Sequence, residues 1–310
     1  MKILITGDDG FVGLNLVNNF IGSNDTIIGL SKKTLASGDT KHQYKRYNAD
    51  VNDIISLNEI LNAEKPDWII HLAAEADVSR SYQYPYDFIK VNTEGTFNLL
   101  EWLKHNTDTK LLYFSTDEVF GEVKQAKETY RPNPLNPYSA SKASAEMFIS
   151  AYSYAFDIKS IIFRPYNIFG LYQKPNRLFA KIIINALLDK PFTLFKETQT
   201  HKRGWIYAEN IYYAVRLLMS KGILGESYNM VYDAHLSVDE IKDAILARLG
   251  KKDLFIGYSE PPQRSKDDVF YDLDGTKLHE LCWKPKYTFE EGLDLTIEWY
   301  KNNLSLFGRR

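Results

Sequence analysis

The sequence lacks the features that define several large classes of protein. Cys282 is the single cysteine among 310 residues, so the chain cannot form an internal disulfide and suits a reducing compartment such as the cytoplasm. No apolar run is long enough to cross a bilayer, and residues 1–7 are typical of a strand entering a turn rather than of a signal peptide. The formal net charge of −2 gives no basic field for nucleic acid or an anionic membrane. We therefore expect a cytoplasmic protein with neither a nucleic-acid nor a membrane partner.

Metal-ligand spacing is also missing from the sequence. The six histidines are scattered along the chain and form no pattern typical of a metal site. His71 lies in the apolar stretch Ile69–Ala74, which favours a packed strand residue over a ligand. The sequence therefore predicts no metal.

Short β-rich segments alternate with longer helical patterns over the first two-thirds of the chain. The β-rich segments are Lys2–Thr6, Thr26–Leu30, Trp68–Ala73, Leu111–Ser115 and Ser160–Arg164. The helical patterns are Phe11–Ile21, Ile54–Leu61, Phe88–His105 and Ser139–Phe156. Strands that are nearly continuous in apolar residues and alternate with helices predict an α/β fold with a doubly wound, Rossmann-like parallel sheet.

The pattern changes after about residue 170. Helical segments follow at Leu178–Leu188, Ile211–Met219, Val238–Leu249 and Phe289–Tyr300, separated by loops rich in proline and charge. We predict a dinucleotide-binding domain over residues 1–170 and a smaller, mostly helical substrate-binding region over residues 171–310, with some interleaving of the two.

A glycine-rich turn joins the first predicted strand to the first predicted helix. Gly7, Gly10 and Gly13 would allow a tight turn, close approach of the backbone to a pyrophosphate and close packing of helix on strand. Phe11 and Val12, the first residues of the predicted helix, would offer free N–H groups to the phosphates. Three glycines can also make a plain turn, but their place directly after the first strand favours a dinucleotide site.

The end of the second predicted strand departs from the usual NAD pattern. An acidic residue normally accepts a hydrogen bond from the ribose 2′-OH there, whereas this chain has Ser31, Lys32 and Lys33. Two ammonium groups suit a 2′-phosphate, which favours NADP over NAD, although solvated lysines are common at strand ends. Asp50 and Val51 would lie beside the adenine, and a solvated loop acid is an equally good interpretation of Asp50.

Tyr138 and Lys142 stand four residues apart at the start of a helical pattern and so share one face of the helix. A tyrosine becomes a usable base only if a nearby cation stabilises its phenolate, and Lys142 supplies that charge. Such a pair is often surface decoration. Its position after the dinucleotide turn, with Thr116 at the end of a predicted strand, favours a catalytic role.

Asp117 and Glu118 follow the same strand end as Thr116. They are an N-cap or exposed turn acids on a simple interpretation. Alternatively they divide the work of an elimination, with Asp117 held protonated by burial or by the negative charge of Glu118. The second interpretation gains weight from Thr116 and Tyr138.

Taken together, these residues resemble the nucleotide-sugar 4,6-dehydratases, a family of extended short-chain dehydrogenases/reductases. The glycine turn and the Tyr138–Lys142 pair are shared with the whole superfamily, whereas Thr116–Glu118 is the specific mark of the dehydratases. Further matching stretches are His71–Glu75, Asn92, Gly95–Thr96, Ser115–Gly121, Tyr138–Ala143, Asn167–Gly170, Arg203–Tyr207 and Trp283–Pro285.

The resemblance implies a cycle on a nucleotide-diphosphate sugar with a tightly bound, recycled cofactor. Tyr138 would take the proton of the sugar 4-OH while hydride leaves C4, and Thr116 would hold O4. Glu118 would then remove the C5 proton as Asp117 protonates the departing C6 hydroxyl, and hydride would return to C6. Lys142 would support Tyr138 and the cofactor ribose, and the cofactor would also contact Leu72, Ala73 and Ala74.

The resemblance leaves the nucleotide base and the hexose open, because the segments near the sugar are altered. Asn167, Arg177, Arg203 and Arg264 are the candidate substrate contacts. A 4-epimerase or 4-keto-sugar reductase of the same family, or a non-catalytic dinucleotide sensor, are the rival functions. A homodimer through helices near residues 88–105 and 139–156 is implied, although an apolar stripe there could equally pack on the sheet.

Overall fold

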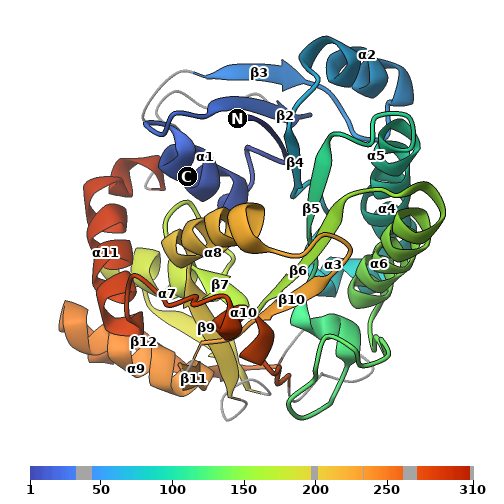
Figure 1. Ribbon diagram of the computed structural model, residues 1–310. Helices are drawn as coiled ribbons and strands as arrows, with labels where there is room; N and C mark the ends of the chain where they lie inside the picture. Colours follow the sequence, from blue (N-terminus) through green and yellow to red (C-terminus); the bar gives the residue numbers. More distant parts are fainter. Residues whose placement is uncertain (33–43, 197–201, 233, 261–270, 308–310) are drawn as a thin grey trace.

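A parallel sheet of seven strands lies at the centre of the molecule (Figure 1). The computed structural model describes residues 1–32, 44–196, 202–232, 234–260 and 271–307. The strand order of the sheet is β10-β6-β5-β4-β1-β2-β3, and each neighbouring pair runs parallel. The strands are β1 Lys2–Thr6, β2 Thr26–Ser31, β3 Lys45–Asn48, β4 Trp68–His71, β5 Lys110–Phe114, β6 Ser160–Pro165 and β10 Ser227–Met230. This doubly wound order confirms the predicted Rossmann-like fold.

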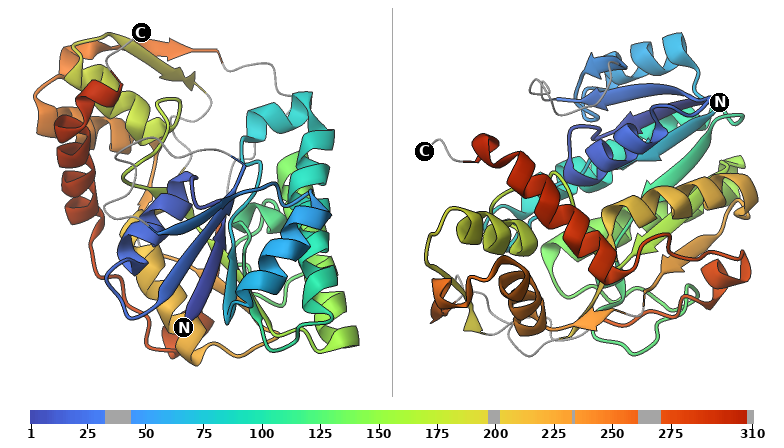
Figure 2. Two further views of the ribbon diagram at one scale, coloured as in Figure 1. Left: turned by 90° about the horizontal axis from the view of Figure 1, so that it is seen from above. Right: turned by 90° about the vertical axis from the view of Figure 1, so that its left-hand side faces the viewer.

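The two faces of the sheet have separate apolar cores, because side chains alternate along each strand. Ile3 and Ile5 of β1 pack on the face covered by α1 Phe11–Phe20 and α8 Ala208–Lys221. Leu4 packs on the opposite face, which is covered by α2 Ile54–Glu64, α5 Gly95–Leu103 and α6 Pro137–Phe156 (Figure 2). Burial on both sides explains why the strands read as nearly continuous apolar runs.

The helix predicted over Phe88–His105 is interrupted. It consists of α4 Pro85–Phe88, the π-helical segment η1 Ile89–Glu94 and α5. Gly95 begins α5 where a Cβ would lie only 2.6 Å from Cγ2 of Val51, so the helix passes close to the loop after β3. π-Helical turns are rare and often occur at functional sites. The apolar periodicity of the sequence does not distinguish them from an α-helix.

The region after residue 170 contains short strands as well as the predicted helices. A third apolar core lies between the helices α7 Leu178–Leu187, α9 Val238–Leu249 and α11 Phe289–Asn302. Two small sheets accompany them, one of β7 Asn167–Phe169, β9 Arg203–Tyr207 and β11 His235–Leu236, the other of β8 Phe192–Phe195 and β12 Phe255–Ser259. The remaining elements are α3 Val78–Gln83, α10 Thr276–Glu280, η2 Asp117–Phe120, η4 Lys252–Leu254 and η5 Leu304–Leu306.

The chain returns to the central sheet after it has entered this region. Helix α8 packs against α1, and β10 pairs with β6 as the last strand of the sheet. Residues on both sides of position 170 therefore share one core. The division at residue 170 stays a prediction.

Candidate active site

The chemistry-bearing residues gather where β1, β4 and β5 end. In doubly wound sheets, ligands bind at the carboxyl ends of the strands, next to the point where the strand order reverses. That point lies between β1 and β4 in this chain. Segment η2 follows β5 and packs against α6, so Thr116, Asp117 and Glu118 come together with the first turns of the helix that carries Tyr138 and Lys142.

The glycine turn after β1 is pressed against the chain that follows β4. Gly7 has a φ of +70°, and a Cβ on it would lie 2.8 Å from the backbone N of Ala73. A Cβ on Gly13 would lie 2.2 Å from the carbonyl oxygen of Gly7. Helix α1 begins after Gly10, and no side chain among the described residues caps its first turn. The turn therefore leaves the N–H groups of α1 for the phosphates of a dinucleotide.

Asp8, inside this turn, is fully buried. Its carboxylate accepts hydrogen bonds from the hydroxyl of Tyr44 and the guanidinium of Arg46, and Arg46 also donates to Ser31. Gly29 provides the space, because a Cβ there would lie 2.1 Å from Oδ2 of Asp8. Arg46 thus compensates a charge that would otherwise repel a pyrophosphate.

Asp8 and Arg46 were not among the predicted site residues. An acid between turn glycines was the available signal, but its partners Tyr44 and Arg46 lie 36 and 38 residues away. Only the pairing of β2 with β3 brings them to the turn.

Thr6 joins the end of β1 to the chain after β4. Its hydroxyl oxygen accepts hydrogen bonds from the backbone N–H groups of Leu72 and Ala73, at 3.2 and 3.1 Å. It lies 2.7 Å from Nδ1 of His71. Since both oxygen lone pairs are used, we assign the hydroxyl as the donor to Nδ1. Burial, together with the charge of Lys142, lowers the pKa of His71 to about 3, so the ring is a neutral, packed strand residue, as predicted.

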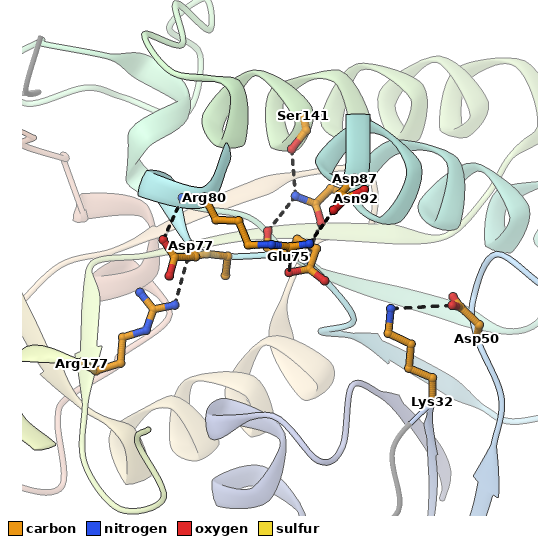
Figure 3. Close-up of polar contacts among 10 residues, drawn as sticks. Lys32, Asp50, Glu75, Asp77, Arg80, Asp87, Asn92, Ser141 and Arg177 are labelled. Atoms are coloured by element: carbon orange, nitrogen blue, oxygen red, sulfur yellow. Dashed lines mark hydrogen bonds and ion pairs between the residues drawn. The ribbon is translucent and has the colours of Figure 1, made fainter. Parts of the chain in front are cut away.

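The network continues from His71 to Tyr138. Nε2 of His71 lies 3.0 Å from the hydroxyl of Thr96, which donates to the carbonyl of Asn92 at 2.7 Å. The Asn92 side chain donates to Ser141 at 2.8 Å (Figure 3). Ser141 in turn donates to the carbonyl of Tyr138 at 2.7 Å. Hydrogen bonds therefore connect the end of β1 with the helix turn that carries the predicted base.

Asn92 also holds the loop that follows Ala74. It donates to the carbonyl of Glu75 at 2.9 Å and accepts from the Glu75 N–H at 2.8 Å. The Glu75 carboxylate is paired with Arg80 at 2.7 Å, and Arg177 donates to the carbonyl of Ala76 at 3.3 Å (Figure 3). The loop therefore joins the predicted cofactor contacts to a predicted substrate contact.

The ends of β2 and β3 place the predicted adenosine contacts side by side. Nζ of Lys32 lies 3.8 Å from a carboxylate oxygen of Asp50 (Figure 3). Val51 is buried against Gly95, whereas Lys32 is half exposed. Asp50 is thus an ion-pair partner of Lys32 rather than a fully solvated acid. Lys33 lies outside the described residues.

Tyr138 lies in the first turn of α6, among groups that shift its proton affinity in both directions. Burial raises the pKa of its phenol, and the charge of Glu118 adds to the rise. The Thr116 hydroxyl acts in the opposite direction. Without an added cation Tyr138 therefore holds its proton firmly.

Lys142 is buried one turn further along α6. Its ammonium nitrogen lies 4.2 Å from the ring centroid of Tyr113, and burial lowers its pKa to about 7, against the opposing charge of Glu146. Glu146 is itself held by Arg164 in a buried, two-bond ion pair at 2.9 and 2.7 Å. A ligand that bonds to Lys142 would favour its charged form, which Tyr138 needs.

Asp117 is a buried acid and not an exposed turn residue. Its side chain is 4% exposed, and one oxygen accepts a hydrogen bond from Thr116 at 3.1 Å. The other oxygen, Oδ2, is buried without a partner among the described residues. Burial raises the pKa of Asp117 to about 6, against the opposing effects of the Thr116 hydroxyl and the Arg203 charge. This environment suits a proton donor.

Glu118 differs from Asp117 in its surroundings. Its side chain is partly exposed and accepts a hydrogen bond from the Asn136 amide at 2.9 Å. Its backbone N–H donates to Thr116, which caps η2. The two neighbouring carboxylates are thus held in different environments, as an acid and a base require. Asn136 was not among the predicted site residues.

The predicted substrate contacts lie on three different segments. The charge of Arg203, at the start of β9, acts on Asp117, and that of Arg177, at the N-terminus of α7, acts on Tyr138. Asn167 begins β7 and is partly exposed. Arg264 lies outside the described residues. Two positive charges therefore act on Asp117 and Tyr138 and favour their deprotonated forms.

Neither a metal cluster nor a membrane helix is found in the parts of the chain that the structure describes. Within those ranges, no three His, Cys, Asp or Glu side chains are grouped so as to hold a metal ion. None of the helices there has both the length and the apolar character to cross a membrane.

Comparison with known proteins places this geometry among enzymes of nucleotide sugars. The model of the NAD dependent epimerase/dehydratase family matches residues 3–230. A dTDP-glucose 4,6-dehydratase of Haemophilus influenzae is 32% identical, over 98% of this chain and 99% of its own. The structure of a dTDP-glucose 4,6-dehydratase from Streptomyces venezuelae with NAD bound has a TM-score of 0.90 and 28% identity, covering 99% of this chain and 98% of that one. A UDP-glucose 4-epimerase from Thermotoga maritima with UDP-glucose also has a TM-score of 0.90, with 27% identity over 98% of this chain and 100% of its own.

Replacing Asp117 by asparagine should stabilise the fold above about pH 6. The pKa of Asp117 is about 6 in the folded chain against an ordinary 3.8, so its ionisation as the pH rises opposes folding. A shift of this size corresponds to at most about 3 kcal/mol. Urea unfolding at about pH 5 and about pH 8 should show the larger gain in the free energy of unfolding at the higher pH. An equal gain at both pH values would contradict the buried acid, and Asp50→Asn, at a partly exposed carboxylate, is the control.

Proposed function

Because the chain belongs to the NAD dependent epimerase/dehydratase family, we propose that it is a nucleotide-sugar 4,6-dehydratase. Such an enzyme converts an NDP-hexose into the NDP-4-keto-6-deoxyhexose with loss of water. The buried acid Asp117 next to Glu118 is the observation that carries the proposal. Oxidation at a hydroxyl carbon needs only a tyrosine and a lysine, whereas loss of water also needs an acid and a base. The similarity to curated dehydratases over the full length supports it.

A bound nicotinamide dinucleotide would supply the hydride chemistry that the cycle needs at C4 and at C6. The glycine turn fits such a cofactor, because Gly7 and Gly13 leave no room for a side chain between the turn, α1 and the end of β4. Gly10, Phe11 and Val12 would hold the pyrophosphate through the start of α1. Leu72, Ala73 and Ala74 would line the other side of the cofactor. Since hydride returns in each cycle, a tightly held cofactor would need no exchange.

Tyr138 would take the proton of the sugar 4-OH during the oxidation. Burial makes its phenol a poor acid, so a cation is needed to stabilise the phenolate. Lys142, four residues along the same helix face, would supply that charge once a ribose hydroxyl bonds to it. Thr116 would hold O4 and keep C4 oriented, with its hydroxyl proton turned from Asp117 to the sugar oxygen.

Asp117 and Glu118 would carry out the elimination that the 4-ketone makes possible. The ketone acidifies the C5 hydrogen, and Glu118 would accept this proton as the C5–C6 double bond forms. Burial raises the pKa of Asp117 to about 6. In its protonated form, Asp117 would give its proton to the departing C6 hydroxyl, which leaves as water. With hydride supplied at C6 and the proton returned to C5 by Glu118, the product would be the 4-keto-6-deoxy sugar, with no net redox change.

The substrate would be bound through its diphosphate by arginines. The charge of Arg203 acts on Asp117, and the charge of Arg177 acts on Tyr138. We assign them, with Arg264, to the nucleotide diphosphate, because guanidinium groups bind phosphate in a bidentate manner. Asn167 would contact the sugar.

NADP is proposed as the preferred cofactor. Ser31 ends β2 and Lys32 follows it, and neither has a carboxylate to accept a hydrogen bond from the ribose 2′-OH. Arg46, whose charge is compensated by Asp8, donates to Ser31 on the same side. The ion pair of Lys32 with Asp50 is half exposed and about 3.8 Å long, so a 2′-phosphate would compete with it for the ammonium group.

A homodimer is proposed through the helices on the α6 side of the sheet. Exposed apolar side chains gather there on α4, η1 and α6, which pack side by side. They are Tyr86 at 69%, Ile89 at 53%, Met147 at 55%, Phe148 at 40% and Tyr154 at 93% exposure. Exposed apolar side chains on neighbouring helices are typical of an interface. The single cysteine suits the cytoplasm, where we place the enzyme.

Incubation with dTDP-, UDP-, CDP- and GDP-hexoses should give a product that is lighter by one water and absorbs in alkali. Glu118→Gln should still oxidise C4 but slow the elimination at least about a hundredfold, because the base is lost. Reduced cofactor would then accumulate and is followed by its absorbance. The exposed neighbour Glu122→Gln is the control.

Two other results would assign a rival activity. Inverted C4 without loss of water would identify a 4-epimerase, and consumption of reduced cofactor with a 4-keto sugar would identify a reductase. Full dehydration by Glu118→Gln would remove Glu118 from the role of base.

Lys32→Ala should weaken NADP binding about tenfold and leave NAD binding nearly unchanged, because one charge-assisted contact to the 2′-phosphate is lost. Isothermal titration of cofactor-free protein with each dinucleotide measures both affinities. Lys45→Ala, at an exposed lysine that is paired with Glu64, is the control. Tighter binding of NAD than of NADP by the natural protein would overturn the preference.

The double variant Ile89→Glu/Met147→Glu should be a monomer under conditions in which the natural protein sediments as a dimer. Glutamates on both helices would leave charge buried at the interface. Ile256→Glu, at a 64% exposed position on β12, should leave the dimer intact. Sedimentation velocity distinguishes the species, and a dimer of unchanged affinity in the double variant would exclude this face.

A further inference from the structure

We infer that Asn136 is a positioning residue that fixes the carboxylate of Glu118 relative to Tyr138. This inference rests on the proposed dehydratase function. The Asn136 side chain is 4% exposed. Its amide nitrogen donates to Oε2 of Glu118 at 2.9 Å. Asn136 does not take part in proton transfer; it acts through Glu118.

The oxygen of the same amide caps the N-terminus of α6, the helix that carries Tyr138. Oδ1 of Asn136 accepts a hydrogen bond from the N–H of Ser139 at 2.8 Å, and the Ser139 hydroxyl accepts from the Asn136 N–H at 3.3 Å. Asn136 is therefore the N-cap of α6, followed at once by Pro137 and then by Tyr138. One planar group thus spans the proposed oxidation base and the proposed elimination base, and its rigidity sets their separation.

The bond from Asn136 gives the carboxylate of Glu118 a defined contact with the start of α6. Glu118 lies on η2, a single short turn whose backbone is held by Thr116, and its side chain is partly exposed. A bond from Asn136 to Oε2 fixes the carboxylate and orients its other oxygen. Loss of a defined orientation at a reacting group is costly even for small displacements.

The bond also favours the ionised form of Glu118, because an N–H donor stabilises a carboxylate but not a carboxyl. The neighbouring charged and titratable groups act in both directions. The charge of Glu118 opposes the ionisation of Tyr138 on α6, whereas Arg177 on α7 favours the phenolate of Tyr138 and Arg203 on β9 favours the carboxylate of Asp117. The Asn136 amide is an uncharged donor in direct contact with the base.

Helix capping alone is the simpler role, and two substitutions separate it from positioning. Serine, aspartate and asparagine are comparable N-caps, so Asn136→Ser and Asn136→Asp should both preserve α6. Serine is shorter and has no amide to reach Glu118, and aspartate places a second carboxylate against it. Asn136→Ala removes the cap as well and reports the structural contribution.

The experiment follows single turnovers of the holoenzyme with the nucleotide hexose that the natural protein dehydrates. The rise of reduced-nicotinamide absorbance reports C4 oxidation, and its decay reports elimination and hydride return. In Asn136→Ser, we expect the rise to change less than about twofold and the decay to slow about tenfold, as loss of one charge-assisted hydrogen bond implies. The acid limb of the decay rate should move to higher pH, and further in Asn136→Asp, because both changes favour the protonated base.

The outcomes separate this inference from the proposed function. If the natural protein dehydrates its substrate and Asn136→Ser and Asn136→Asp eliminate water at the natural rate with the natural pH profile, Asn136 is only a cap. Equal slowing of rise and decay in Asn136→Ser, with a lowered melting temperature, would also assign a structural role. If the natural protein releases no water from any nucleotide hexose, the dehydratase proposal fails first and the inference falls with it.

Discussion

The hydrogen bonds of Thr6 hold the proposed active site together at the point where the strand order reverses. Through Leu72 and Ala73, this hydroxyl fixes the end of β4 beside the glycine turn. Through His71, Thr96, Asn92 and Ser141, it is connected to the carbonyl of Tyr138. Each member uses its donors and acceptors within the network, and a satisfied buried network is rigid. The proposed cofactor site and the proposed base therefore sit on one continuous scaffold, and the π-helical turn that carries Asn92 is part of it.

Burial of ionisable groups is what this scaffold makes possible, and it costs stability. Asp117 has a buried oxygen without a partner among the described residues, and burial lowers the pKa of Lys142 to about 7. The charged form of each group would be more stable in water. Their placement gives chemistry instead: an acid that stays protonated nearer to neutrality, and a lysine whose charge depends on what binds beside it. Where charge serves structure, it is compensated, as in the pairs of Asp8 with Arg46 and of Glu146 with Arg164.

Much of the fold and part of the site could be predicted from local pattern. The predicted strand Lys2–Thr6 and helix Val238–Leu249 have these bounds in the structure, because apolar periodicity and turn residues act over a few neighbours. The glycine turn and the spacing of Tyr138 and Lys142 were visible for the same reason. The break in the helix over residues 88–105 was not, since an α-helix and a π-helix share their apolar pattern over so few residues.

The sequence by itself determined the doubly wound class, the identity of the chemical groups and their order along the chain. Only the tertiary structure decided which groups are buried and which meet. The sequence alone is compatible with an exposed turn acid at Asp117, and the packing of η2 against α6 buries it. Asn136 and Glu118 are 18 residues apart, and Arg46 lies 38 residues from Asp8. Contacts over such separations depend on how strands and helices pack, and desolvation, which sets the proton affinities of Asp117 and Lys142, is a property of the packed chain and not of any segment.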